Sequence, residues 1–241
     1  MKCYFMKKKT ETFADLIERF RYHFDTRTVF DDFLTLTLTC FCLDVKTGLS
    51  YDEPLYLETI GKYAKHDLRH IFPQMLAKLI TEMERRSGSA SGNDVLGEYY
   101  ETHLARNGLS QYFTPWPICE MIARSVTSGH TEESRVQRIL DPCCGSGRMI
   151  LAGSRVLGPN NEYYAIDVDA TCVKMTALNL FLNGVFKGEV LCADALNPDS
   201  FAVSYKLSLL PFGVFRITEK ERSLLFKMHR NAFMGKPGKP D

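Results

Sequence analysis

The stretch Asp141-Pro-Cys-Cys-Gly-Ser-Gly147 decides the fold of this chain, because it stands where a strand-like run gives way to a helix-like one. The run VQRIL (136–140) precedes it, and the run MILAGSRVL (149–157) follows it. Glycines at positions 145 and 147 let the backbone turn sharply and approach a ligand without a Cβ clash. The N-terminus of the following helix adds free N–H groups and a partial positive charge. These features predict a ligand-binding loop at the start of a helix.

A second signal lies at Asp167, which stands 20 residues after Gly147 and directly follows the strand-like run EYYAI (162–166). A carboxylate at this place in a Rossmann-like fold accepts hydrogen bonds from ribose hydroxyls, so the two features together predict a nucleoside-type ligand. Asp169 competes for the ribose role, although it can instead cap the helix that follows it. Asp194 ends the next strand at the same rim, where it either accepts from an adenine amino group or is an ordinary loop aspartate.

Strand-like and helix-like runs alternate in the C-terminal part of the chain, which is typical of a parallel sheet with crossover helices. The run EVLCA (189–193) predicts a third strand, and a last strand is expected around 203–210. No fifth strand is evident, so we expect the strand near 203–210 to form a poorly protected edge. The prediction is an α/β protein with a Rossmann-like, incomplete sheet.

The N-terminal part has a different character. Residues 11–86 carry apolar side chains at helical spacing, as in FADLIERFRYHF and FPQMLAKLITEMERR. The Gly/Ser-rich stretch SGSASGND (87–94) follows and is the most natural domain boundary. We therefore expect a helical domain over residues 1–90 and a ligand-binding domain over residues 91–241.

The composition is that of a soluble globular protein, with 45% apolar and 24% charged residues. The formal net charge of +1 lacks the basic excess of a free-standing DNA-binding domain. No apolar run reaches the roughly 18 residues of a membrane span, and the start of the chain does not resemble a secretory signal. We expect a cytoplasmic protein with no membrane contact. None of the eight cysteines forms a CxxC pair, so no zinc site is expected.

Four short segments follow one another along the chain: SQYFTP (110–115), DPCCGSG (141–147), AIDVD (165–169) and CADAL (192–196). They resemble motifs X, I, II and III of N6-adenine DNA methyltransferases, with the closest likeness to the modification subunits of type I restriction–modification systems. The runs LGEYYE (96–101) and ALNLFLNG (177–184) look like the same group. The resemblance covers roughly 94–213. It implies the methyltransferase fold, S-adenosylmethionine as cofactor, N6-adenine methylation of DNA, and DNA and a modification-system subunit as partners.

The resemblance also assigns roles to single positions. The segment 113–115 closes over the methionine end of the cofactor, and Asp141 holds its ammonium group. Asp167 stands where the family has its ribose-binding acid, usually a glutamate, and Asp194 meets the adenine ring. The cofactor-binding set implied in this way is Tyr112, Phe113, Thr114, Pro115, Asp141, Cys143, Gly145, Gly147, Asp167, Val168, Asp194 and Ala195.

The sequence departs from the family at the catalytic tetrapeptide, which in the family reads Asn-Pro-Pro-Phe or Asp-Pro-Pro-Tyr. Its first side chain and the next carbonyl accept hydrogen bonds from the target amine, and its aromatic ring stacks on the flipped-out base. The corresponding segment here is Leu209, Leu210, Pro211 and Phe212. A leucine side chain offers no acceptor, so no catalytic residue is assigned. Asn197-Pro198 is a weaker alternative that reads more naturally as a turn, and Ser208 is one residue out of register.

Three functional hypotheses follow. The first is an S-adenosylmethionine-binding protein that is weak or inactive alone. The second is an active adenine methyltransferase that needs a partner chain, and the third is a non-catalytic interaction module that has lost its ligand. For the edge near 203–210, we expect a second protein chain, as a homodimer or a modification-subunit partner, to contribute cover. The alternative cover is a helix near 218–230 of the same chain.

Overall fold

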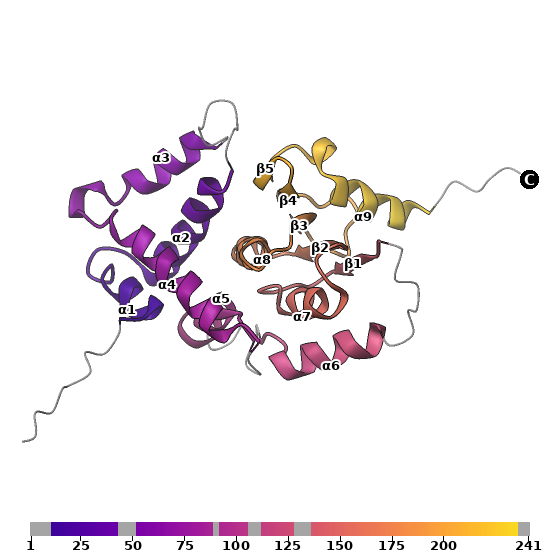
Figure 1. Ribbon diagram of the computed structural model, residues 1–241. Helices are drawn as coiled ribbons and strands as arrows, with labels where there is room; N and C mark the ends of the chain where they lie inside the picture. The colour runs from indigo at the N-terminus through magenta and orange to yellow at the C-terminus, as the bar shows by residue number, and fades with distance from the viewer. Residues whose placement is uncertain (1–10, 43–51, 89–91, 106–111, 128–135, 236–241) are drawn as a thin grey trace, which may run out of the picture.

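The computed structural model describes residues 11–42, 52–88, 92–105, 112–127 and 136–235. The N-terminal part is helical, as the apolar spacing predicts. Its elements are α1 (Phe13–Glu18), α2 (Thr26–Cys40), α3 (Glu53–Gly61), the short 3-10 turn η1 (Ala64–His66) and α4 (Ile71–Arg86). The side chains of Thr12 and Asp25 begin α1 and α2 by accepting hydrogen bonds from backbone N–H groups. Figure 1 shows these helices grouped on one side of the sheet. None of the helices described is long and apolar enough to cross a membrane.

A short helical segment leads from α4 toward the sheet. Its elements are α5 (Val95–Tyr99), the π-helical turn η2 (Tyr100–Leu104) and α6 (Trp116–Thr127). The expected domain boundary near residue 90 falls at residues 89–91, which lie outside the described residues, and it stays a prediction. One hydrophobic cluster includes Phe33 of α2 together with Leu178 of the helix that crosses between the second and third strands. The helical part and the sheet therefore share one core.

The sheet has five strands in the order β1-β2-β3-β4-β5. The first three run parallel and are joined by crossover helices, as predicted: β1 (Arg138–Asp141), α7 (Arg148–Leu157), β2 (Glu162–Asp167), α8 (Ala170–Leu182) and β3 (Lys187–Cys192). The last two strands run antiparallel: β4 (Val203–Leu209) and β5 (Phe212–Ile217). The protein is of the α/β class, with a mixed rather than a fully parallel sheet.

The expectation that the strand near 203–210 forms an edge with no fifth strand beside it is wrong. β4 lies between β3 and β5, and it pairs Ser208 with Gly213 in a tight hairpin. The physical reason is chain length: only residues 193–202 separate β3 from β4. A parallel crossover needs about a dozen residues or more, usually with a helix, so the chain returns antiparallel. The edge of β4 is thus covered by β5 of the same chain, and no second chain is needed there.

Helices cover both faces of the sheet, because successive side chains of a strand point to opposite faces. One face packs in the main hydrophobic cluster with α7 and α8 through Tyr163, Ala165, Val190 and Cys192. The other face packs against α9 (Leu224–Met234) through Tyr164, Ile166, Leu191 and Ala193. The helix expected near 218–230 therefore exists, but it covers a face of the sheet rather than the edge of β4.

A buried carboxylate attaches α9 to the sheet. Glu189 of β3 accepts hydrogen bonds from the hydroxyls of Ser204 and Ser223. It also accepts from the backbone N–H groups of Leu224 at 3.0 Å and Leu225 at 3.2 Å. These N–H groups belong to the first turn of α9 and have no partner inside the helix. A negative charge at this end also complements the helix dipole, which explains why an acid is tolerated in the core.

Candidate functional site

Three carboxylates lie at the carboxyl ends of the three parallel strands. Asp141 and Asp167 are the last residues of β1 and β2, and Asp194 follows the end of β3. Parallel pairing aligns Asp141 with Ala165 and Asp167 with Cys192, so all three acids lie along one rim of the sheet. The structure therefore brings together the acids that the sequence assigns to one site. This rim is where open α/β sheets bind their ligands.

The glycine loop between β1 and α7 is fixed to this rim. Gly145 and Gly147 have φ angles of 55° and 82°, in the left-handed region that favours glycine. The N–H of Gly145 donates to Oδ2 of Asp167 at 2.8 Å. The hydroxyl of Thr176 on α8 donates to the carbonyl oxygen of Gly145 at 2.9 Å. The loop is thus tied both to the end of β2 and to α8.

Two of the rim acids, Asp141 and Asp167, are half-buried, whereas Asp194 is exposed. Burial raises the pKa of Asp141 above its ordinary value, against the hydrogen bond donated by the N–H of Cys143 at 3.1 Å. Burial likewise raises the pKa of Asp167. Within the part of the chain that the structure describes, no lysine or arginine forms an ion pair with Asp141, Asp167 or Asp194. Such a rim suits a ligand that carries positive charge and hydrogen-bond donors.

Asp169 takes the second of the two roles considered for it. Its carboxylate accepts from the N–H groups of Thr171 at 2.8 Å and Cys172 at 3.4 Å, and so caps α8. Its own N–H donates to Oδ1 of Asp167 at 2.9 Å. Asp169 therefore helps to orient the Asp167 carboxylate.

The segment before α6 reaches the glycine loop through Phe113. A Cβ atom placed on Gly145 would lie 2.6 Å from the Phe113 ring, so ring and loop are in close contact. Three further members of the predicted set are exposed to solvent: Tyr112, Thr114 and Pro115. Ser110 and Gln111, the first two residues of the SQYFTP segment, lie outside the described residues.

The remaining members of the predicted set, Cys143, Val168 and Ala195, each lie next to one of the rim acids or within two residues of it. Cys143 is exposed, whereas its neighbour Cys144 is buried and burial raises its pKa. Val168, which directly follows Asp167, is 75% exposed, and Leu196 is 84% exposed two residues after Asp194. Ala195, which lies between Asp194 and Leu196 in the sequence, is half-buried. Leu196 was not predicted, although an exposed apolar residue beside a rim acid offers a surface for a planar ring.

The segment Leu209-Leu210-Pro211-Phe212 does not reach this rim. It forms the turn of the β4–β5 hairpin, with Leu209 paired to Phe212. Just before it, Ser208 pairs with Lys187, the first residue of β3. β3 continues from Lys187 to Cys192 before the rim begins, and at about 3.3 Å per residue this separates the turn from the rim by roughly 17 Å. The tetrapeptide thus lies at the amino ends of the parallel strands, opposite the acids.

Asn197 and Ser208, the two weaker alternatives for the group that accepts from the target amine, take part in other structural features. Asn197 forms the turn that was expected, since its side-chain oxygen accepts from the N–H of Asp199 at 3.1 Å and its carbonyl accepts from the N–H of Ser200. Ser208 lies at the same end of the sheet as the hairpin turn. The side-chain oxygen of Asn197 is thus used within its own turn, and Ser208 lies away from the rim.

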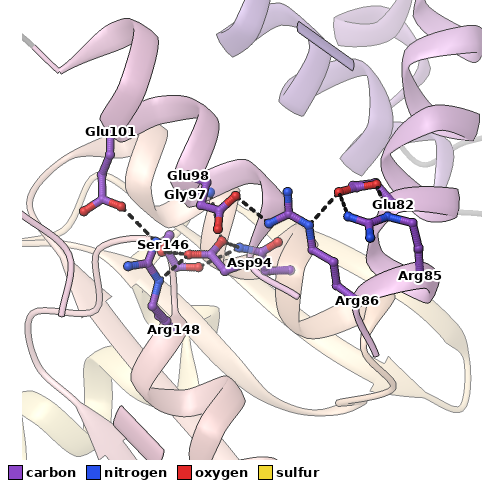
Figure 2. A network of polar contacts seen from close by, with 10 residues as sticks. Glu82, Arg85, Arg86, Asp94, Gly97, Glu98, Glu101, Ser146 and Arg148 are labelled. Carbon is purple, nitrogen blue, oxygen red and sulfur yellow. Dashed lines mark hydrogen bonds and ion pairs between the residues drawn. The ribbon is translucent and has the colours of Figure 1, made fainter. Parts of the chain in front are cut away.

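Three residues of the site were missed by the sequence interpretation: Asp94, Glu101 and Arg148. They form part of a polar network that runs from α4 to the glycine loop (Figure 2). The guanidinium of Arg148 donates to Asp94 at 2.9 Å and to Glu101 at 2.9 Å. The signal that points to them is weak: an arginine directly after Gly147, and acids within the run around LGEYYE.

The parallel strands, crossover helices and rim define a Rossmann-like α/β protein. A sequence profile of the family described as N-6 DNA Methylase matches residues 91–220, which is more than half of the chain. The chain belongs to this family, as the four motifs indicate.

Two relatives are methylase subunits of type I restriction enzymes. The MpnII methylase subunit of Mycoplasma pneumoniae is 27% identical over 112 residues, which cover 44% of this chain and 20% of the relative. The MjaVIII methylase subunit of Methanocaldococcus jannaschii is 31% identical over 133 residues, covering 50% of this chain and 21% of the relative. The matched stretch is thus about a fifth of each relative. A solved methyltransferase subunit of a type I restriction–modification system from Streptococcus thermophilus aligns with a TM-score of 0.41 and 14% identity, over 78% of this chain and 58% of that chain.

Proposed function

We propose that this chain binds S-adenosylmethionine at the rim formed by β1, β2 and β3. The observation that carries the proposal is the row of acids Asp141, Asp167 and Asp194 beside the glycine loop, which no described lysine or arginine neutralises. S-Adenosylmethionine carries an ammonium group, a sulfonium, a ribose diol and an adenine amino group. Each of these groups is attracted to a carboxylate or donates a hydrogen bond to it.

The residues present fit this ligand from one end to the other. Asp141 accepts from the ammonium group, Asp167 from the ribose diol and Asp194 from the adenine amino group. The segment 113–115 covers the methionine end. The glycine loop borders the rim beside Asp167, to which the N–H of Gly145 donates at 2.8 Å, and the exposed Val168 side chain packs on the adenine ring. When bound, the cofactor supplies the methyl group that the family transfers to adenine.

The chain alone is proposed to transfer methyl groups weakly or not at all. The exocyclic amine of adenine is a poor nucleophile, because its lone pair is delocalised into the ring. Holding it in line with the methyl group requires a fixed acceptor, and losing one such contact typically costs about 100–1000-fold in rate. The hairpin turn that carries Leu209 lies at the opposite end of the sheet from the acids, which supports this part of the proposal.

A second candidate function is adenine methylation of DNA in a complex with a modification-system subunit or a second copy of the chain. The favouring observation is that, among the described residues, only β2 pairs with β1, the outer strand that ends at Asp141. Leu140 of this strand is 51% exposed, and Val136, two residues before the strand begins, is 54% exposed. An unpaired strand edge with exposed apolar side chains invites pairing with another chain. A partner bound there would stand next to the rim and could bring the missing acceptor and DNA contacts.

Calorimetric titration with S-adenosylmethionine and S-adenosylhomocysteine tests the proposal. Asp141→Ala and Asp167→Ala should each weaken binding by roughly 1–3 kcal/mol, the usual cost of removing a hydrogen-bonded charged partner. Asp199→Ala is the matched control, because this exposed acid lies in the loop after the same rim and pairs with Arg230 at 3.3 Å. No binding at millimolar ligand would show that the loop has been misinterpreted.

A methyl-transfer assay on unmethylated DNA separates the two candidate functions. The purified chain is expected to transfer no labelled methyl group above background. Transfer that appears only when a modification-system subunit is added supports the second function. Robust transfer by the chain alone would contradict the proposed loss of activity.

A further inference from the structure

Arg148 connects three separate segments of the chain to the glycine loop. It is the first residue of α7, directly after Gly147, and it is only 8% exposed. Its Nε donates to Asp94 at 2.9 Å, its Nη1 to the carbonyl oxygen of Thr114 at 3.2 Å and its Nη2 to Glu101 at 2.9 Å. Burial opposes its charge, yet the attraction of Asp94 and Glu101 raises the pKa of Arg148 above its ordinary value. A charge held this strongly fixes the groups around it.

Asp94 anchors one side of this arrangement. Its carboxylate also accepts from the N–H of Gly97, the hydroxyl of Ser146 and the amide of Asn179. Figure 2 shows Asp94 between the start of α5 and the glycine loop, with Arg148 and Ser146 turned toward it. Every lone-pair direction of this buried acid is therefore used, and it holds the Arg148 guanidinium in one orientation.

Glu101 carries the connection onward to Phe113. One of its oxygens accepts from Arg148, and the other accepts from the backbone N–H of Phe113 at 2.8 Å. Glu101 and Tyr100 both lie in the π-helical turn η2, a rare geometry that is frequent at functional sites. The Tyr100 ring stacks on the Phe113 ring, with centroids 5.8 Å apart and planes 26° apart. Backbone and ring of Phe113 are thus held from the same turn.

The ring of Phe113 is held directly against the glycine loop. Besides Tyr100, the Arg148 guanidinium also lies near this ring, 5.7 Å from its centroid. Arg148 also binds the next carbonyl along, that of Thr114. Arg148 and Glu101 therefore hold the segment 113–115 over Gly145, together with Cys119 of α6, whose thiol donates to the carbonyl oxygen of Thr114 at 3.4 Å. The side chains of Thr114 and Pro115 are themselves exposed.

We propose that Glu101 and Arg148 are positioning residues that hold the segment 113–115 over the glycine loop and thereby set the affinity of the site for its cofactor. This inference rests on the proposed binding of S-adenosylmethionine. An ion pair that only stabilises the fold would act differently, and the chain contains one for comparison. Glu98, one helical turn before Glu101, pairs with Arg86 of α4, and no hydrogen bond or ion pair among the described residues joins its side chain to the segment 113–115.

The test compares Glu101→Gln with Glu98→Gln, the same chemical change on the same helical segment. A glutamine at 101 cannot satisfy both partners, because one of its two polar atoms is a donor facing a donor. Amide hydrogen exchange at Phe113 should accelerate about tenfold in Glu101→Gln, as expected for loss of one hydrogen bond to a charged group. Trp116, the only tryptophan of the chain, begins α6 just after this segment and should show altered emission in the same variant. Glu98→Gln should leave both signals unchanged.

The affinity of the two variants for the cofactor product is the second measurement of this test. The dissociation constant for S-adenosylhomocysteine should rise about tenfold in Glu101→Gln and stay within about twofold in Glu98→Gln. Equal affinities in the two variants would overturn the proposal, as would unchanged exchange at Phe113. If the unaltered chain binds no ligand while the exchange difference persists, the proposed function has failed and the role in affinity falls with it. Should Glu101→Gln not fold, Phe113→Leu must weaken binding by a similar factor, because it removes the ring from the loop and leaves the ion pairs intact.

Discussion

Replacing Gly145 by alanine tests the contact between the glycine loop and Phe113. Gly145 has a φ angle of 55°, which residues with a side chain rarely adopt. An added Cβ would also lie 2.6 and 2.7 Å from two ring atoms of Phe113, far inside van der Waals contact. The ring cannot move without cost, because it is stacked on Tyr100. Gly145→Ala therefore combines backbone strain with a steric clash.

A matched substitution separates these two costs. Gly184 has a φ angle of 81°, and a Cβ placed there meets nothing within 4 Å. Gly184→Ala should cost only the left-handed strain, about 1–2 kcal/mol. Gly145→Ala should cost the same strain and a further amount of about 1–3 kcal/mol for overpacking against the ring. The difference between the two variants measures the contact.

Urea unfolding monitored by circular dichroism gives the two free energies of unfolding. The double variant Gly145→Ala with Phe113→Ala should recover the overpacking cost, since the ring that the new Cβ meets is gone. Combining Phe113→Ala with Gly184→Ala should instead be additive, because these sites do not touch. Equal losses at positions 145 and 184, or no recovery in the double variant, would refute the close approach of Phe113 to the loop.

Three further predictions address the rim and the hairpin. Asp141→Asn should raise the free energy of unfolding at pH 7, because burial raises the pKa of Asp141 and a neutral amide avoids burying charge. This gain in stability should vanish as the pH falls through that pKa, because the wild-type carboxyl then gains its proton. A variant that is less stable than the wild type in urea titrations at neutral pH would contradict this prediction. The pair Leu209→Asn and Leu210→Pro should change calorimetric affinity for S-adenosylhomocysteine by less than about twofold, because the hairpin turn lies far from the rim; a larger change would place the turn at the site. In mass-spectrometric thiol labelling, the exposed Cys143 should be protected by S-adenosylhomocysteine while the exposed Cys40 is not, and equal protection would argue against binding at the glycine loop.

Much of the site could be predicted from the sequence, because its signals are local. Glycines between a strand and a helix, and an acid at the end of the next strand, are read within one β-α-β unit of about 30 residues. Parallel strands then place Asp141, Asp167 and Asp194 on one rim without further information. The helices before residue 87 were likewise readable from the spacing of apolar side chains.

The sequence interpretation did not predict the antiparallel direction of β4, although the reason for that direction is visible in the sequence. The alternation of strand-like and helix-like runs predicted a parallel sheet, and the strand near 203–210 was counted in it. The short connection 193–202 has no room for a crossover helix, so this strand runs antiparallel instead. The same reversal lets β5 pair with β4, so that β1 and β5 are the outer strands of the described sheet.

The sequence by itself determined the class of fold, the family and the place of the glycine loop, since each depends on residues close together in the chain. Only the tertiary structure decided which groups hold that loop. Arg148 lies 34, 47 and 54 residues from Thr114, Glu101 and Asp94, and nothing in the spacing pairs them. A buried arginine needs several acceptors, and which acceptors it finds depends on how α5, η2 and α6 pack against α7. Such partners are fixed by packing in three dimensions, because buried charges must be satisfied wherever the fold places them.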